Sequence, residues 1–378
     1  MKIAIITSRY PEKNNPYNHM FVHMRCVEMI KQGENIEVFV PSNISERYIY
    51  DSVTVNKMPS KEIVKRIQGI DVLYLHLLNI YPFNKVNGSP IYKYIIDNKT
   101  PFAMYVHGSE VQRYTSRMYE FRFKITDVLK WIKKDIFVIP IMKRFTRKTI
   151  KNRNAMFIFP SKWMKEEMER NLNCSISRYK IIPNGIDTEF FAYRNQYENR
   201  YKLLTIRSLS GKVYDIEKTV NVMSHLPEQF TLDIYGEGVY LNQYLKLIQN
   251  KNLTERIQII PTFIGKEKMK NIFKKYSAFI STTKIDSQGI TIMEAMSSGL
   301  LGINTNNSSK KEFFNDLSNS VLGNDPKEIA NKINKVCNNP DLYEKITKKG
   351  SESIKKINIA ITVKKEIKAL SKLKKPNN

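Results

Sequence analysis

The sequence predicts an α/β protein made of two Rossmann-like domains, each built on a doubly wound parallel sheet. Its 378 residues are too many for one ordinary hydrophobic core and suit two domains. Short, continuously apolar segments alternate with helical patterns, as strands and helices do in parallel sheets that are buried on both faces. This alternation stops at a polar linker at 187–201 and then starts again.

The first series spans residues 1–187. It opens on the strand KIAIIT, continues through the helical pattern FVHMRCVEMIKQG, which Gly33 closes, and returns to the strand IEVFVPS. A strand, a helix and a second strand in this order form the unit from which doubly wound sheets are built. Further strands are predicted at 71–77, 101–108 and 155–161, and the turn residues of KIIPNGID end the series.

The second series spans residues 188–350 and repeats the pattern. Strands are predicted at 203–208, 230–238, 257–263, 277–282 and 300–305, and helices at 216–226, 266–276 and 290–299. Residues 351–378 are predicted to form a basic C-terminal helix or tail. In open sheets of this kind ligands bind beyond the carboxyl ends of the strands, so residues that directly follow strands are the candidates for function.

Composition and charge restrict the function classes. Lys and Arg number 62 against 36 Asp and Glu, a net charge of +26, which indicates a polyanionic partner such as nucleic acid, anionic lipid or a phosphorylated substrate. Cys26, Cys174 and Cys337 are spaced too widely for a zinc motif or a disulfide framework. No apolar run approaches the roughly 18 residues of a membrane span, and the start of the chain reads as a strand rather than a signal peptide. We therefore expect a cytoplasmic protein with reduced, buried thiols.

The stretch KIDSQGITIMEAMSSG, at 284–299, places two carboxylates at the end of a buried strand. Asp286 and Gly289 lie in the loop after the strand, and Glu294 lies in a helix that begins near Ile292. Free N–H groups at the start of a helix attract anions such as phosphate, and carboxylates beside a phosphate can accept hydrogen bonds from sugar hydroxyls. Spacing alone favours a simpler interpretation, in which Asp286 is a turn residue and Glu294 offsets the helix dipole.

The same stretch resembles the E-x7-E motif of retaining glycosyltransferases of the GT-B fold, in glycosyltransferase family 4 (glycosyl transferases group 1). The resemblance implies that Glu294 holds the nucleotide ribose and that Gly289, with Ile290 and Thr291, faces the donor. Asp286 stands where the family has a glutamate that binds donor-sugar hydroxyls, so its reach is one methylene shorter. The resemblance also implies two domains that face each other across a cleft and a C-terminal helix that returns to the first domain.

Other segments of the second domain share this resemblance. LLTIRSLSGK resembles the family's strand followed by two basic residues, which implies that Arg207 and Lys212 grip the donor diphosphate. An arginine fork and a lysine charge suit a diphosphate leaving group, although Lys212 alone is also explained as a surface cation. Ile206 replaces the glycine that the family has before the arginine. YGEGVY resembles the family's G-x-G turn, which implies that Gly236 contacts the donor.

In the first domain, YVHGSEV resembles the family's T-x-H-G segment, which implies that His107 touches the donor sugar. The alternative is a buried histidine with satisfied hydrogen bonds. His76, in LYLHL, either lines the cleft or packs in the core. The loop PEKNNPYNHMFVH replaces the Gly-Gly turn of many relatives, and Asn18, which tolerates positive φ, stands near that turn on the acceptor side.

Residues 113–153 interleave Lys and Arg with aromatic and bulky apolar side chains. This composition favours a helix that lies in an anionic membrane interface. The alternative is a helix that packs its aromatic side chains into the core and exposes its charges. Nucleic-acid binding would use similar residues, but no recognition motif accompanies them.

These observations predict a retaining glycosyltransferase that moves a sugar from a nucleoside diphosphate sugar to a lipid-linked saccharide. The product would be a cell-surface polysaccharide (capsule, lipopolysaccharide or exopolysaccharide), and the enzyme would lie peripherally on the inner face of the membrane. We expect no cofactor, no nucleic-acid partner and no bound metal, because Arg207 and Lys212 would take the place of a divalent ion. The alternatives are a nucleotide-sugar epimerase on the same fold and a basic, non-enzymatic nucleic-acid-binding protein. A glycosidase is disfavoured because its paired carboxylates must flank a glycosidic bond.

Overall fold

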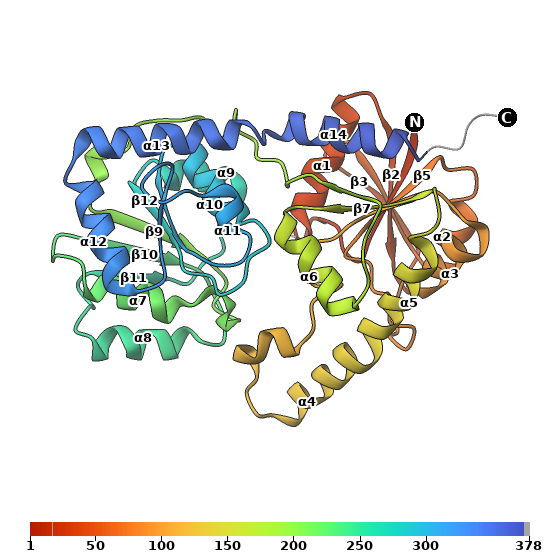
Figure 1. Cartoon of the computed structure of the whole chain (residues 1–378), viewed down its shortest axis with the longest axis horizontal. Helices are drawn as coiled ribbons and strands as arrows, with labels where there is room; N and C mark the ends of the chain where they lie inside the picture. Colours follow the sequence, from red (N-terminus) through yellow and green to blue (C-terminus); the bar gives the residue numbers. More distant parts are fainter. Residues whose placement is uncertain (17, 374–378) are drawn as a thin grey trace. The chain divides into compact units, whose positions relative to one another are not determined.

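The computed structural model describes residues 1–16 and 18–373 and divides the chain into two compact units. Unit 1 comprises Met1–Gly185 together with the chain from Ile359 onward, and unit 2 comprises Ile186–Asn358. Each is an α/β unit with helices on both faces of a largely parallel sheet (Figure 1), so the predicted fold class is confirmed. The sequence analysis placed the division after residue 187, whereas the structure places it after Gly185.

Unit 1 contains a sheet of eight strands in the order β3-β4-β2-β1-β5-β6-β7-β8. The strands are β1 (Lys2–Thr7), β2 (Asn35–Pro41), β3 (Glu46–Tyr50), β4 (Val53–Met58), β5 (Val72–His76), β6 (Phe102–Tyr105), β7 (Ala155–Phe159) and β8 (Tyr179–Ile181). Every residue of β5, β6 and β7 is buried, which explains the continuous apolar runs in the sequence. All neighbouring pairs are parallel except β3–β4, so the sheet is mixed rather than purely parallel.

The β3–β4 hairpin is an element that the sequence analysis did not predict. Its turn residues Asp51 and Ser52 have φ values of 41° and 68°. A two-residue hairpin turn with positive φ at both central positions is of type I′, whose usual sequences are Asn-Gly or Asp-Gly. The dipeptide Asp-Ser does not indicate such a turn, because Ser seldom adopts this conformation.

The two faces of the unit 1 sheet pack against different helices. The helices of this unit are α1 (Met20–Lys31), α2 (Ser60–Arg66), α3 (Ser89–Asn98), α4 (Ile125–Trp131), α5 (Ile139–Thr149), α6 (Lys162–Leu172) and α14 (Ile359–Ser371), of which all but α4 contribute to the two cores. One apolar core holds buried residues of α2, α3, α5 and α6, and the other holds buried residues of α1 and α14. Helix α6 begins where Ser161 accepts a hydrogen bond from the Met164 N–H at 3.2 Å, an ordinary N-cap.

Helix α14 returns to unit 1, as the resemblance implied. Its Glu366 is fully buried and accepts hydrogen bonds from Arg25 Nε at 2.7 Å and from the Tyr74 hydroxyl at 2.9 Å. Arg25 also donates to Asn184 Oδ1 at 3.2 Å. The predicted tail 351–378 is not a single element, because residues up to Lys355 belong to a helix of unit 2 and Ile359–Ser371 form α14. Residues 374–378 of this prediction lie outside the described residues.

The basic aromatic segment 113–153 is not one helix. It consists of a short 3₁₀ turn at Thr115–Glu120, helix α4, a π-helical stretch at Ile132–Val138 and helix α5. Figure 1 shows α4 standing off from the sheet of unit 1. Phe145 of α5 is buried in the core, whereas Phe123 and Leu129 are 90% and 61% exposed. The second half of the segment therefore packs an aromatic side chain into the core, as the alternative predicted, whereas the first half exposes apolar side chains. The membrane interface stays a prediction.

Unit 2 contains a parallel sheet of six strands in the order β11-β10-β9-β12-β13-β14. The strands are β9 (Lys202–Ile206), β10 (Thr231–Tyr235), β11 (Ile257–Ile260), β12 (Ala278–Ser281), β13 (Leu301–Thr305) and β14 (Val321–Gly323). From β9 the chain adds β10 and β11 on one side, and it then returns to add β12 and the later strands on the other side. The boundary between β9 and β12 is therefore a topological switch point, where such sheets bind ligands at their carboxyl ends.

The helices of unit 2 also cover both faces of their sheet. They are α7 (Ile216–Ser224), α8 (Leu241–Asn250), α9 (Lys266–Phe273), α10 (Ile290–Ser297), α11 (Lys310–Phe313), α12 (Pro326–Cys337) and α13 (Pro340–Lys355). Buried residues of α7, α8 and α12 form one core, and buried residues of α9 and α10 belong to the other. Helix α10 begins at Ile290, earlier than the expected start near Ile292, so its free N–H groups lie directly after Gly289.

Candidate functional site

Arg207 lies at the switch point of unit 2, directly after β9. Its guanidinium donates hydrogen bonds to Ser281 Oγ, at the end of β12, at 2.9 Å and to its neighbour's carbonyl, Ile206 O, at 3.2 Å. Among the residues that the structure describes, Arg207 Nε is buried and has no hydrogen-bond partner. A buried donor without a partner costs free energy, which a ligand acceptor would recover.

Two carboxylates act on the charge of Arg207. Burial lowers the pKa of the Arg207 guanidinium, and the negative charges of Asp286 and Glu294 oppose that change. The aromatic rings of Tyr214 and Phe279 lie 5.6 and 5.4 Å from the guanidinium carbon. Asp286 and Glu294 therefore act electrostatically on Arg207, although no hydrogen bond joins Arg207 to either carboxylate in the described interactions.

The G-x-G turn after β10 presses against the segment that carries Arg207. A Cβ added to Gly236 would lie 1.8 Å from Arg207 O, and one added to Gly238 would lie 2.1 Å from Leu209 C. Backbone hydrogen bonds from Arg207 N to Tyr235 O at 2.9 Å and from Leu209 N to Glu237 O at 2.8 Å join the two segments. Glycine is required here because only a residue without a side chain permits this approach.

The loop between β12 and α10 carries Asp286. Asp286 Oδ1 accepts a hydrogen bond from Gln288 N at 3.0 Å, as a turn residue does. Gly289 follows with φ 85°, in the left-handed region that favours glycine, and the helix then starts at Ile290 without a side-chain cap. The first N–H groups of α10, including that of Thr291, have no partners within the helix.

Glu294 lies in the second turn of α10 and is partly buried. Burial raises the pKa of the Glu294 carboxyl to about 7, against the lowering effects of the Lys266 and Arg207 charges. Lys266 also forms an ion pair with Asp187 at 2.9 Å. The sequence analysis assigned Asp187 only to a turn between the domains and did not consider Lys266, because the ion pair joins residues far apart in the chain.

Lys212 lies in a 3₁₀ turn at Lys212–Tyr214, and its ammonium is 5.6 Å from the centroid of the Tyr240 ring. It is partly buried rather than a fully exposed surface cation. Its segment follows the same strand as Arg207, but Lys212 does not line the cavity described next.

A cavity of about 610 Å³ lies at the carboxyl ends of β9, β10 and β11. Of the predicted site residues it is lined by Arg207, Gly236 and Thr291. Its apolar walls include Phe263 and Met269. The other lining residues are Ile206, Ser208, Ser210, Tyr214, Tyr235, Glu237, Gly238, Thr262 and Ile264. A pocket of this volume, with an apolar wall and several polar side chains, has the character of a small-molecule site.

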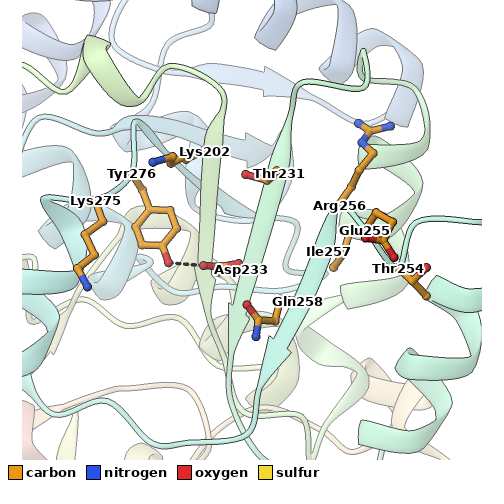
Figure 2. Close-up of a pocket in the computed structure, with 10 residues that line it drawn as sticks. All are labelled: Lys202, Thr231, Asp233, Thr254, Glu255, Arg256, Ile257, Gln258, Lys275 and Tyr276. Carbon is orange, nitrogen blue, oxygen red and sulfur yellow. Dashed lines mark hydrogen bonds between the residues drawn. The ribbon is translucent and has the colours of Figure 1, made fainter.

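A second cavity of about 590 Å³ lies over the opposite, amino-terminal ends of the same strands (Figure 2). Lys202, Thr231 and Ile257, which begin β9, β10 and β11, all line it. The Tyr276 hydroxyl donates a hydrogen bond to Asp233 in this cavity. No predicted site residue lines it, and its place at the amino-terminal strand ends argues against a donor site.

In unit 1, His76 is the last residue of β5, His107 follows β6, and the two side chains are in contact. His76 Nδ1 and His107 Nε2 are 3.0 Å apart, and burial lowers the pKa of each imidazole well below its usual value. His76 is fully buried, and within residues 1–16 and 18–373 its Nε2 has no hydrogen-bond partner. Two neutral imidazoles in contact share a single proton between their facing nitrogens. His76 is therefore a core residue that contacts His107.

Glu110 contacts this histidine pair and the charge of His19 acts on it, and the sequence analysis selected neither residue. His19 adopts the left-handed conformation expected for Asn18, with φ 51°, and Thr7 Oγ1 is 2.9 Å from its Nδ1. The Glu110 carboxylate accepts hydrogen bonds from Gly108 N at 3.0 Å and from the backbone N–H of His107 at 3.4 Å. Asn18 itself donates only a backbone bond, to Asn15 O at 3.3 Å, among the interactions of the described residues.

Two structural findings concern metals and membranes. In residues 1–16 and 18–373, no three His, Cys, Asp or Glu side chains gather in a way that could hold a metal ion. In the same part of the chain, no helix combines the length and apolarity that a membrane span requires.

Cys26 and Cys337 are buried free thiols, as expected, whereas Cys174 is only partly buried.

Residues 187–353 match the profile of the protein family described as glycosyl transferases group 1. The match coincides closely with unit 2, Ile186–Asn358. It therefore covers the strands and loops that carry Arg207, Asp286 and Glu294.

The curated relatives include glycosyltransferases. The GtfA subunits of UDP-N-acetylglucosamine–peptide N-acetylglucosaminyltransferase from Limosilactobacillus reuteri subsp. suis and Streptococcus agalactiae are each 26% identical, over 35% and 37% of this chain. The chain spans about a quarter of their length, 25% and 27% respectively. An uncharacterized glycosyltransferase of Methanocaldococcus jannaschii is 21% identical over 340 residues, which cover 89% of this chain and 90% of that protein.

Solved structures with similar folds cover nearly the whole chain. The structure of HepE of Anabaena in complex with UDP and glucose has a TM-score of 0.72 at 13% identity. The match covers 98% of this chain and 99% of the HepE chain. Sucrose-phosphate synthase of Thermosynechococcus elongatus has a TM-score of 0.71 at 14% identity, with the same coverage of 98% and 99%. At these identities the likeness shows the fold, which is the GT-B fold that the resemblance implied.

Proposed function

We propose that this chain, a protein of GT-B fold whose residues 187–353 match the glycosyl transferases group 1 family, is a glycosyltransferase that uses a nucleoside diphosphate sugar. The observation that carries this proposal is the buried, unpartnered Nε of Arg207, at the switch point of unit 2 and beside a cavity of about 610 Å³. A cation held in this way needs an anionic acceptor. The UDP in the HepE structure is such a ligand in a protein of similar fold.

The diphosphate would lie between Arg207 and the start of α10. Arg207 supplies a charged, planar donor, and the uncapped first turn of α10 supplies backbone N–H groups from Ile290 and Thr291. Gly289, with φ 85°, turns the backbone without a side chain in the way. The Arg207 guanidinium and the N–H groups of α10 would stabilise the negative charge that develops on the diphosphate as its bond to the sugar breaks.

The two carboxylates would bind hydroxyl groups. Glu294 would accept hydrogen bonds from the ribose, and Asp286, which approaches Gly289 closely, would accept them from the donor sugar. The Asp286 Oδ2 atom lies 3.4 Å from where a Cβ of Gly289 would be, so the carboxylate borders the start of α10. The apolar wall formed by Phe263 and Met269 offers a surface on which a nucleobase can pack.

The proposed reaction retains the anomeric configuration and uses no metal ion. Arg207 and Lys212 would neutralise the diphosphate as it leaves, and the acceptor hydroxyl would attack from the same face and pass its proton to the leaving phosphate. The bond between the anomeric carbon and the phosphate oxygen breaks as the new glycosidic bond forms. Proton NMR of the first product formed tests retention, and activity in excess chelator tests metal independence.

The acceptor side of the proposal concerns the exposed first half of segment 113–153. Phe123, Ile125 and Leu129 are 90%, 79% and 61% exposed, beside the exposed cations Arg122 and Lys130. Apolar side chains with basic neighbours bind anionic membrane surfaces. We propose that this surface docks on a membrane that carries a lipid-linked saccharide acceptor, in the synthesis of a cell-surface polysaccharide.

A vesicle experiment tests this membrane proposal. The double variant F123S/L129S should lose binding to vesicles that contain anionic lipid, because about 0.8 kcal/mol is lost for each buried CH₂ group. The control variant is V239S, which alters an exposed apolar residue of unit 2, 71% exposed. Vesicle binding by F123S/L129S equal to that of V239S would exclude this surface as the membrane contact.

A nucleotide panel tests the donor proposal. Thermal unfolding of the full chain should shift upward with one nucleoside diphosphate of the set UDP, GDP, ADP, CDP and dTDP, because a ligand that binds only the folded state stabilises it. The corresponding sugar nucleotides, incubated with and without saccharide acceptors, then identify the donor. Epimerisation of the donor without any acceptor would instead support an epimerase, and no shift with any nucleotide would remove the proposal.

A further inference from the structure

A buried lysine that the sequence analysis did not select lies beneath the candidate donor site. Lys310, the first residue of α11, is 1% exposed. Its ammonium donates hydrogen bonds to Thr305 Oγ1 at 2.7 Å, to Thr283 O at 3.1 Å and to Ser281 O at 3.3 Å. Three oxygen acceptors satisfy an ammonium group completely. A buried lysine is rare without such partners, so these three hydrogen bonds explain how its ammonium group can be buried.

The contacts of Lys310 lead directly to Arg207. Ser281 accepts hydrogen bonds at two atoms, its carbonyl O from Lys310 and its Oγ from Arg207 Nη2 at 2.9 Å. Ser281 is the last residue of β12 and pairs with Asn304 of β13, after which the two strands no longer pair. Lys310 thus donates hydrogen bonds to backbone carbonyl groups at the end of β12 and just beyond it.

Lys310 and its two predecessors also fix the loop that carries Asp286. Ser309 Oγ donates to Asp286 O at 2.9 Å, and Asp286 N donates to Ser308 Oγ at 3.3 Å. Ser308 adopts a φ of 51°, an unusual conformation for serine. Three consecutive residues, 308–310, therefore bind the backbone of 281–286.

We propose that Lys310 is a positioning residue for donor binding, which holds Arg207 through Ser281 and holds Asp286 through its loop. This inference rests on the proposed function, because it assumes that Arg207 and Asp286 meet the donor. The geometry explains why a charged side chain occupies an interior position, because an apolar residue there would remove the ammonium donor from Ser281 O and Thr305 Oγ1. Thr283 O would keep its hydrogen bonds from Thr305 Oγ1 at 2.9 Å and Asn307 Nδ2 at 3.1 Å. A buried acceptor that loses its donor costs about 1–3 kcal/mol.

The electrostatic environment of Lys310 supports the proposal. Burial lowers the pKa of the Lys310 ammonium to about 7, with the charge of Asp286 opposing this change and those of Arg207 and Lys218 adding to it. Asp215 is the other charged group that acts on Lys310, and it favours the protonated form. A bound diphosphate adds negative charge and favours protonation further, so donor binding near neutral pH should draw a proton onto Lys310.

The test compares the full chain with K310M and with K311M, its neighbour, which is exposed and carries the same charge. Calorimetric titration with UDP, or with whichever nucleoside diphosphate stabilises the wild type, is run at a temperature where circular dichroism shows each protein folded. We expect K310M to bind about tenfold more weakly and K311M to bind within a factor of two of the wild type. Repeating the titration in buffers of different ionisation enthalpy should show less proton uptake by K310M.

A second variant keeps the proposal testable if K310M does not fold. S281A removes the hydroxyl that Arg207 binds but leaves the carbonyl that Lys310 binds. It should weaken nucleotide binding several-fold with little change in thermal stability. Unchanged affinity in folded K310M, or in S281A, overturns the inference while the proposed function stands. Failure of the wild type to bind any nucleoside diphosphate overturns both.

Discussion

Arg207→Ala is the substitution that most directly tests the donor site. The guanidinium is held by Ser281 and lies in the field of Asp286 and Glu294 before any ligand arrives. Two unit charges about 4 Å apart attract by about 4 kcal/mol at an effective dielectric constant of about 20. Preorganised donors of this kind contribute about 2.7–4 kcal/mol to transition states, so turnover should fall by about 10²–10³-fold.

The same substitution should cost the unliganded protein little stability. Burial lowers the pKa of Arg207, which means that the folded state disfavours its charge. Removing the side chain relieves that cost but also removes the contacts with Tyr214 and Phe279. We therefore expect a melting temperature within a few degrees of the wild type, together with a large loss of activity.

The assay combines release of nucleoside diphosphate from the donor with calorimetric measurement of its affinity. R207K keeps a positive charge but loses the planar fork, and should fall between the wild type and R207A. R194A is the matched control, because Arg194 is an exposed arginine of unit 2, 60% exposed, that pairs only with Glu198 among the described ion pairs. Turnover and affinity of R207A within threefold of R194A would refute the assignment of Arg207.

Two further predictions concern Glu294 and Gly236. Because burial raises the pKa of Glu294 to about 7, the folded state binds its proton more tightly than the unfolded state; this stabilisation is complete below about pH 4.5 and is lost as the pH rises through about 7. The free energy of unfolding of the wild type should therefore decrease between about pH 5 and pH 8, and this decrease should be smaller by about 1–2 kcal/mol in E294Q. Thermal unfolding at the two pH values measures it. Parallel pH profiles of the two proteins would contradict the predicted protonation. In Gly236→Ala, the new Cβ would collide with Arg207 O, so we expect a loss of about 1–3 kcal/mol and weaker nucleotide binding. Gly33→Ala is the comparison for backbone strain alone, because Gly33 has a φ of 86° and its added Cβ meets no atom within 4 Å. Unchanged stability and nucleotide affinity in Gly236→Ala would show that crowding against Arg207 is unimportant.

The alternation of apolar and helical segments sufficed to predict the two sheets, because strands such as β5 and β7 are buried on both faces and show it in every residue. The sequence pattern indicates edge strands less clearly. Strand β3 is mostly exposed and lacks a continuous apolar run, and its turn contains Asp51 and Ser52 instead of the Gly that is typical of such turns. The π-helical stretch at Ile132–Val138 has no signature in residue spacing.

The candidate site could be predicted only where a local motif recorded it. Arg207 and Glu294 stand in recognisable segments, and the charge of each acts on the pKa of the other. Lys310 is one of two adjacent lysines in SSKKEFF, and nothing in these letters indicates that one is buried and the other exposed. Its importance comes from contacts with β12 and β13, which only the folded chain brings together. His19 was missed for the same reason, because tertiary structure rather than residue type sets its left-handed conformation.

The return of α14 to unit 1 determines the order in which a ribosome can complete the protein. Until Glu366 emerges, Arg25 would have to be buried without its carboxylate, and Val363 and Leu370 would be missing from the apolar layer beside α1. The first 185 residues therefore cannot reach their final packing during synthesis, whereas Ile186–Asn358 contains all the strands of its own sheet and can fold earlier. Unit 1, which contains the first 185 residues, therefore completes its packing after unit 2.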